Sequence, residues 1–132
     1  MKKDETLPIA YYSHGMHIFN TPQEKRDIEI IQAMGYSVMN PNNKYTASQF
    51  NEALQTMDYS DAFDYVFGAM IKASELLIFR SHPDGSIPFT VGKEIEFANN
   101  IERVVLELPS GISRRKLDSG ETEEYLREIG QQ

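Results

Sequence analysis

Residues 76–99, LLIFRSHPDGSIPFTVGKEIEFAN, decide the fold that this sequence predicts. The stretch opens with four apolar residues, Leu76 to Phe79, a short run typical of a buried strand. A loop rich in proline, glycine and serine follows over residues 81–88, and a helix is expected from Thr90, with that threonine as its N-cap. A strand, a loop and a helix N-terminus in this order mark the place where open α/β sheets bind ligands.

Strand and helix patterns alternate through the rest of the chain. Strands are expected at residues 8–12, 36–39, 76–80 and 104–108. Helices are expected at residues 21–34, where a capping box begins the helix, and at residues 58–73, 90–100 and 117–129. The pattern of residues 45–55 is weaker and fits either a short helix or a mobile loop.

This order of elements predicts an α/β fold. It is a small doubly wound, Rossmann-like parallel sheet of four to five strands with helices on both faces. The strand at residues 36–39 should lie on one side of the first strand, and the strand at residues 76–80 on the other. No internal linker divides the chain, so we expect one domain over residues 1–132.

The carboxyl ends of the first and third strands should lie side by side at one edge of this sheet. These strands end at Ser13 and at Arg80. The arrangement brings Tyr11, His14 and the helix that carries Glu94 into one crevice, and we expect the functional site there.

Composition narrows the classes of function. The 132 residues are 40% hydrophobic and 25% charged, as in an ordinary globular protein. The chain has no cysteine, which excludes disulfides, thiol chemistry and cysteine zinc sites. A net charge of −7 argues against binding a nucleic-acid polymer, although one small phosphate is compatible with it. No apolar run approaches a membrane span and no signal peptide is visible, so we expect a cytoplasmic protein with no membrane partner.

Glu94 is the strongest candidate for a reactive group. On a helical wheel it flanks the apolar face of its helix, whereas Glu96 points nearly opposite, toward solvent. The helix N-terminus favours an ionised carboxylate, and Gly92 leaves room for a ligand to approach. The alternative is an ordinary acid of the first helical turn, and the pattern alone favours this alternative.

Other polar residues each allow two interpretations. Asp64 flanks the apolar stripe of its helix, where it would bind sugar hydroxyls or assist proton transfer, or it belongs to a solvated surface. Arg80 either meets a phosphate or a base or forms a surface ion pair. Asp84 lies in a turn that would cover the crevice as a lid or be a plain turn. His14 is a candidate donor of a hydrogen bond to substrate.

Several common sites have no support in the sequence. The three histidines match no metal-ligand spacing, so no metal site is expected. No dinucleotide-binding glycine motif, P-loop or nucleophilic serine elbow is present.

Four segments together resemble the nucleoside 2-deoxyribosyltransferase superfamily, which includes the 2-deoxynucleoside 5-phosphate N-hydrolases. The segments are IAYYSHG at residues 9–15, GYSVMNPNN at residues 35–43, ELLIF at residues 75–79 and TVGKEIEFA at residues 90–98. The most specific piece is VGKE at residues 91–94, which is similar to the V-G-x-E motif whose glutamate is the family's nucleophile. The likeness spans residues 9–108 in the order of elements.

The resemblance implies roles for individual residues. Glu94 would be the nucleophile, Tyr11 would hold it in place, and Asp64 would contact the sugar or the base. The loop from Ser13 through His14 to Gly15 would line the site. The remaining candidates for substrate binding are Arg80, Asp84 and Gly92.

The resemblance also implies a reaction, which is cleavage or transfer at the N-glycosidic bond of a (deoxy)nucleoside or nucleoside monophosphate. It implies no metal or organic cofactor, and assembly as a homo-oligomer, a dimer or larger, with the helix at residues 117–129 as the expected interface. Two alternatives stay open. One is a non-enzymatic module that binds a nucleotide or a nucleotide-derived signal, and the other is cleavage of another N-glycosidic bond, such as that of a ribonucleotide or NAD.

Overall fold

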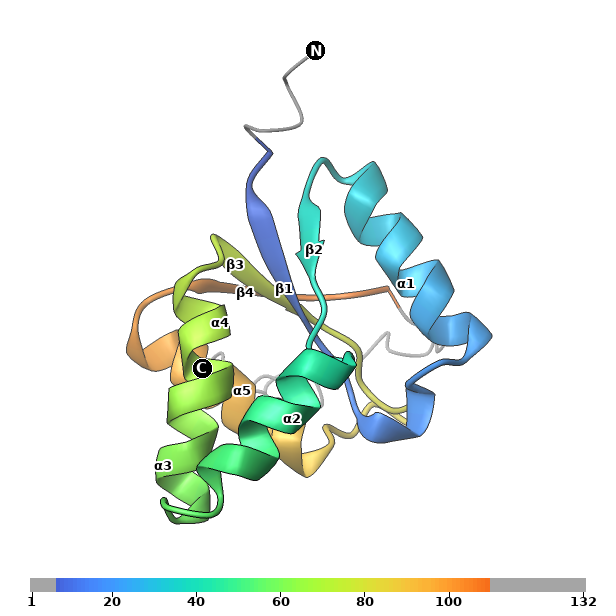
Figure 1. Cartoon of the computed structure of the whole chain (residues 1–132). Coiled ribbons are helices and arrows are strands. Elements are labelled where there is room, and N and C mark those ends of the chain that lie inside the picture. Colours follow the sequence, from blue (N-terminus) through green and yellow to red (C-terminus); the bar gives the residue numbers. More distant parts are fainter. Residues whose placement is uncertain (1–6, 110–132) are drawn as a thin grey trace.

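Four parallel strands form the centre of the protein (Figure 1). The computed structural model describes residues 7–109. The strands are β1 (Ile9–Ser13), β2 (Ser37–Met39), β3 (Leu76–Phe79) and β4 (Val104–Glu107). Their order across the sheet is β2-β1-β3-β4, and all three pairings are parallel. The predicted α/β fold and the predicted neighbours of the first strand are therefore confirmed.

Helical segments connect the strands. They are η2 (Met16–Ile18), α1 (Pro22–Ala33), α2 (Lys44–Ala53), α3 (Tyr59–Phe63), η3 (Asp64–Gly68), α4 (Ala69–Lys72) and α5 (Phe89–Asn100). The weak pattern at residues 45–55 thus belongs to a helix, α2. The elements α3, η3 and α4 follow one another without a break, and η3 is a π-helical turn in the helix predicted at residues 58–73. The helix predicted at residues 117–129 lies outside the described residues.

Both faces of the sheet are covered, because side chains alternate along each strand. On one face, Tyr11 and Leu77 pack with buried residues of α4 and α5. On the other, Tyr12 and Ile78 pack against Ile31 of α1. Figure 1 shows α1 on one side of the sheet and α4 with α5 on the other. Adjacent tyrosines of β1 therefore serve opposite faces.

Two predicted helix starts have different outcomes. Thr21 caps α1 as expected, accepting a hydrogen bond from the Glu24 backbone N–H at 3.4 Å. The cap of α5 is Pro88 and not Thr90, because the extended backbone of Pro88 leads directly into a helix that begins one residue before Thr90. Glu94 consequently lies in the second turn of α5, farther from the helix N-terminus than the sequence analysis placed it.

Within residues 7–109, no helix is long and apolar enough to cross a membrane.

Candidate active site

A buried glutamate lies where α5 crosses the end of β1. Glu94 is 6% exposed, and its Oε2 accepts a hydrogen bond from the Tyr11 hydroxyl at 2.7 Å. Its Oε1 accepts a hydrogen bond from the Ser13 hydroxyl. Tyr11 and Ser13 are two residues apart on β1 and so point to the same face, the one that α5 covers. The strand therefore holds both carboxylate oxygens, and Tyr11, Ser13 and Glu94 are brought together.

Burial sets the protonation of this group. It raises the pKa of Glu94 to about 7, against the two hydroxyl hydrogen bonds, which lower it. Burial and the neighbouring Glu94 carboxylate raise the pKa of Tyr11 well above its usual value. The phenol therefore stays protonated and donates a hydrogen bond to Glu94. We expected the helix N-terminus to favour the ionised form of Glu94, but burial has the larger effect on its pKa. A pKa near neutrality suits a general acid or base, whereas a nucleophile needs the ionised form, which the hydroxyls of Tyr11 and Ser13 favour.

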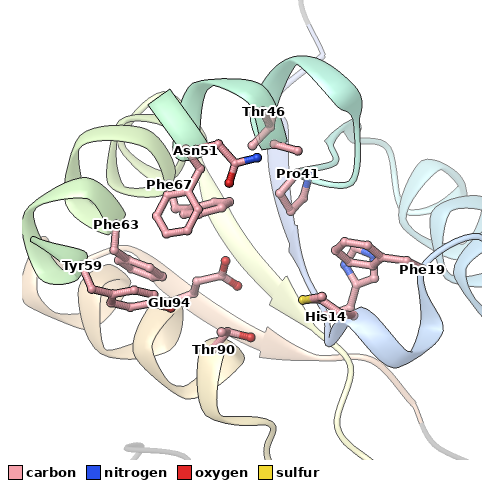
Figure 2. A pocket seen from close by; sticks show the side chains of 13 residues that line it. His14, Phe19, Pro41, Thr46, Asn51, Tyr59, Phe63, Phe67, Thr90 and Glu94 are labelled. Atoms are coloured by element: carbon pink, nitrogen blue, oxygen red, sulfur yellow. The ribbon is translucent and has the colours of Figure 1, made fainter. Parts of the chain in front are cut away.

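Glu94 faces a cavity of about 260 Å³. Figure 2 shows its carboxylate in the open space between aromatic side chains and the side that carries His14 and Pro41. The cavity is lined by His14, Met16, Phe19, Pro41, Thr46, Ala47, Phe50, Asn51, Tyr59, Phe63, Phe67, Thr90 and Glu94. Most of these residues come from η2, α2, α3 and η3, and from these elements the sequence had suggested only Asp64, the first residue of η3, for the site.

Aromatic rings form one wall of the cavity, which we call the aromatic wall: Phe50, Tyr59, Phe63 and Phe67. The ring of Phe50 lies 5.7 Å from that of Tyr59 and 5.1 Å from that of Phe67, and the rings of Phe63 and Phe67 lie 5.4 Å apart. The rings support one another at the spacing usual for aromatic pairs. Such a wall is suited to a flat, apolar part of a ligand.

Gly68 allows the aromatic wall to approach α5. A side chain on Gly68 would come within 2.7 Å of the ring of Phe97, which lies on α5. The π-turn η3 therefore packs against α5 at a distance that only glycine permits.

His14 lines the cavity, but its ring nitrogens already have partners. Nδ1 lies 3.1 Å from the Tyr12 carbonyl oxygen, and Nε2 lies 2.9 Å from a carboxylate oxygen of Glu24. The ring stacks on Tyr12 at 3.7 Å, and burial lowers the pKa of His14 despite these hydrogen bonds. The expectation that His14 donates a hydrogen bond to substrate is therefore corrected, since no ring nitrogen is left for it.

Glu24 does not complete the predicted capping box, because the Thr21 backbone N–H donates to the Ile18 carbonyl at 3.2 Å instead. Its carboxylate accepts hydrogen bonds from the Asn20 backbone N–H at 2.9 Å and from the Asn42 amide at 2.8 Å, in addition to its contact with His14. Burial opposes ionisation, but these hydrogen bonds hold the pKa of Glu24 below its usual value. The residue ties the loop after β1 to the loop after β2.

Arg80 does not reach the cavity. It shares a face of the sheet with Ile78, two residues earlier, and there it forms hydrogen bonds to Asp27 of α1 at 3.0 and 2.5 Å. The remaining guanidinium nitrogen of Arg80, Nη1, donates a hydrogen bond to the Pro109 carbonyl at 2.8 Å. The Tyr12 hydroxyl donates to the same Asp27 carboxylate at 2.6 Å. Of the two interpretations of Arg80, the structure shows an ion pair, which is buried and not at the surface.

Three other candidates also lie away from the cavity. Asp64 is exposed at the start of η3 and is not a lining residue. Asp84 is exposed in its turn and accepts hydrogen bonds from the backbone N–H and the hydroxyl of Ser86, at 2.9 and 2.7 Å. A side chain on Gly92 would contact only Ile87, at an ordinary 3.9 Å, so no crowding requires glycine there.

Gly15 supports the site indirectly. A side chain at this position would meet the ring of His17 at 2.7 Å and Pro88 at 3.2 Å. The residue lets the loop after β1 pack against the loop that leads into α5, but it does not line the cavity.

The chain matches no model of a protein family, no curated protein and no solved structure in three separate comparisons. The likeness to the nucleoside 2-deoxyribosyltransferase superfamily therefore has no support beyond the residues that carry it.

Proposed function

We propose that this protein cleaves, or transfers a sugar at, the N-glycosidic bond of a (deoxy)nucleoside or nucleoside monophosphate, with Glu94 as the nucleophile. One observation carries the proposal: a buried carboxylate is held at both oxygens by hydroxyls of β1 and faces a cavity with an aromatic wall. The V-G-x-E resemblance agrees with this role.

The reaction has two steps. A carboxylate oxygen of Glu94 bonds to the anomeric carbon, and the carbon–nitrogen bond breaks, with its electron pair leaving on the base. Charge in the transition state resembles that of an oxocarbenium ion, as in retaining glycosidases. Water then attacks the anomeric carbon of the ester and frees Glu94, or a second base does so and completes a transfer. A 2-deoxy sugar is favoured because it lacks the hydroxyl that disfavours positive charge there.

Direction of attack suggests how the substrate lies. Because the nucleophile approaches opposite to the leaving group, the base should point away from Glu94. Figure 2 shows the Asn51 amide on the other side of the open space from the Glu94 carboxylate. The base would then stack on the aromatic wall, and the Asn51 amide would offer it one donor group and one acceptor.

Release of free base tests this function. Nucleosides, their monophosphates and NAD are incubated with the protein, and free base is measured by chromatography. We expect release with wild type, loss of orders of magnitude in Glu94→Gln, and nearly full activity in Glu96→Gln, because Glu96 is exposed on the same helix. A 2-deoxy-2-fluoro nucleoside should leave a sugar adduct on the peptide that contains Glu94.

A non-enzymatic binding module is the second candidate. The raised pKa of Glu94 favours it, because a protonated carboxyl group can donate a hydrogen bond to a ligand without attacking it. Tight binding of a nucleoside with no base release would select this alternative. Robust release that persists in Glu94→Gln, with no adduct, would exclude Glu94 as the nucleophile.

A further inference from the structure

We infer that the cavity takes an uncharged nucleoside and discriminates against the corresponding 5-monophosphate, an inference that rests on the proposed function. It concerns the charge of the ligand, which the proposed function leaves open.

The lining residues that the structure describes offer no cation. Within the described part of the chain, no lysine or arginine lines the cavity. His14 is a lining residue, but both of its ring nitrogens are engaged by Glu24 and by the Tyr12 carbonyl. Among residues 7–109, the lining therefore presents one acid, Glu94, and no basic group with a free N–H to oppose it.

Two basic residues that lie close to the site in sequence do not line the cavity, although one of them, Lys93, contacts a ring of its aromatic wall. Arg80 directly follows β3, but it is paired with Asp27 on the opposite face of the sheet. Lys93 precedes Glu94, yet its Nζ lies over the rings of Phe63 and Phe89, 5.3 and 5.9 Å from their centroids. Neither is a lining residue of the cavity.

A phosphate would face unfavourable electrostatics here. It carries about −1.5 to −2 charges at neutral pH, and the N-terminal turn of α5 opposes it with only about half a positive charge. A second negative charge near Glu94 would also favour the protonated carboxyl and so remove the nucleophile.

Calorimetry with unreactive ligands tests the inference on the wild-type protein, whose Glu94 is intact. The ligands are a carbocyclic 2-deoxynucleoside, which has no glycosidic bond to cleave, and its 5-monophosphate. We expect the nucleoside to bind at least about tenfold more tightly at pH 7.5. Equal binding, or tighter binding of the monophosphate, overturns the inference.

A variant with an added cation provides the second test. Met16 lines the cavity and is 74% exposed, so Met16→Lys should place an ammonium group at its rim without disturbing the core. The affinity for the monophosphate relative to that for the nucleoside should rise about fivefold or more. Met34→Lys is the matched control, because Met34 is also exposed, at 47%, but lies at the end of α1. An unchanged ligand ratio in Met16→Lys contradicts the electrostatic argument.

Base release from the ordinary nucleosides separates this inference from the proposed function. Release together with equal binding of the two carbocyclic ligands would leave the function standing and overturn the inference. A preference for the nucleoside without release would support the inference for a binding module. No binding of either ligand overturns both.

Discussion

The hydroxyl oxygen of Tyr11 lies 2.7 Å from Oε2 of Glu94, although 83 positions separate the two residues in the chain. This hydrogen bond favours the ionised form of Glu94. Tyr11→Phe should therefore raise the pKa of Glu94, move the pH–rate profile to higher pH, and slow base release by roughly 10- to 150-fold at neutral pH. The measurement is kcat against pH. Tyr12→Phe is the control, because it removes a hydrogen bond to Asp27 on the opposite face of the sheet. It should leave the midpoint of the pH–rate profile unchanged.

Glu94 should make stability depend on pH. Its pKa rises from 4.5 to about 7 on folding, so the folded protein binds more protons than the unfolded chain between these values. The associated stabilisation is fully present below pH 4.5 and is lost as pH rises through 7, with a total of about 3 kcal/mol at 1.36 kcal/mol per pKa unit.

Urea denaturation of wild type and Glu94→Gln at pH 5 and pH 8 checks this dependence. The glutamine variant should lose much less stability over that interval, whatever its absolute stability. Equal losses in the two proteins would show that Glu94 is not buried as an acid with a raised pKa.

Arg80 should matter for stability and not for substrate binding. Arg80→Met leaves the Asp27 carboxylate buried without its cation, which should lower the free energy of unfolding by about 3–5 kcal/mol. KM of the folded fraction should change little. The control is Arg26→Met on the exposed side of α1, which should unfold like wild type. A raised KM with unaltered stability would restore the role in substrate binding that the sequence suggested.

Asn51 should affect the choice of base. Asn51→Leu removes an amide that lines the cavity, and kcat/KM should fall roughly 2- to 10-fold for bases that offer a donor and an acceptor. For unsubstituted purine deoxyriboside the loss should be smaller. Gln55→Leu, an exposed amide just after α2, should change neither value. The same loss with every base would mean that Asn51 does not contact the base.

The alternation of elements was enough to predict the sheet and the neighbours of β1. The helical wheel also placed Glu94 beside the core, and Glu94 is buried whereas Glu96 is exposed. The same wheel misplaced Asp64, because it assumed a regular helix and η3 begins at this residue with π-helical bonding. Strand alternation, applied to Arg80, would have assigned it to the face of Ile78.

The aromatic wall was harder to find. Tyr59, Phe63 and Phe67 recur at helical spacing, and that pattern is the one expected for a core. Their exposure to a cavity depends on how α2 packs against α3 and η3, which no local pattern specifies. The N-cap of α5 was assigned to Thr90 because threonine is a common capping residue. Pro88, which precedes the helix and forms no side-chain cap hydrogen bond, was not considered.

The residues around the cavity belong to two separately packed parts of the fold. Glu94 is fixed by hydroxyls of β1, at the centre of the sheet, whereas the aromatic wall belongs to α2, α3 and η3, which form a separate small cluster beside it. Substitutions in that cluster can reshape the ligand pocket while the anchored carboxylate stays where it is. An insertion in β1 has the opposite effect, because a shift of one residue would move Tyr11 to the other face of the sheet and turn its phenol away from Glu94. The scaffold thus allows variation in the walls of the cavity and very little in how the carboxylate is held.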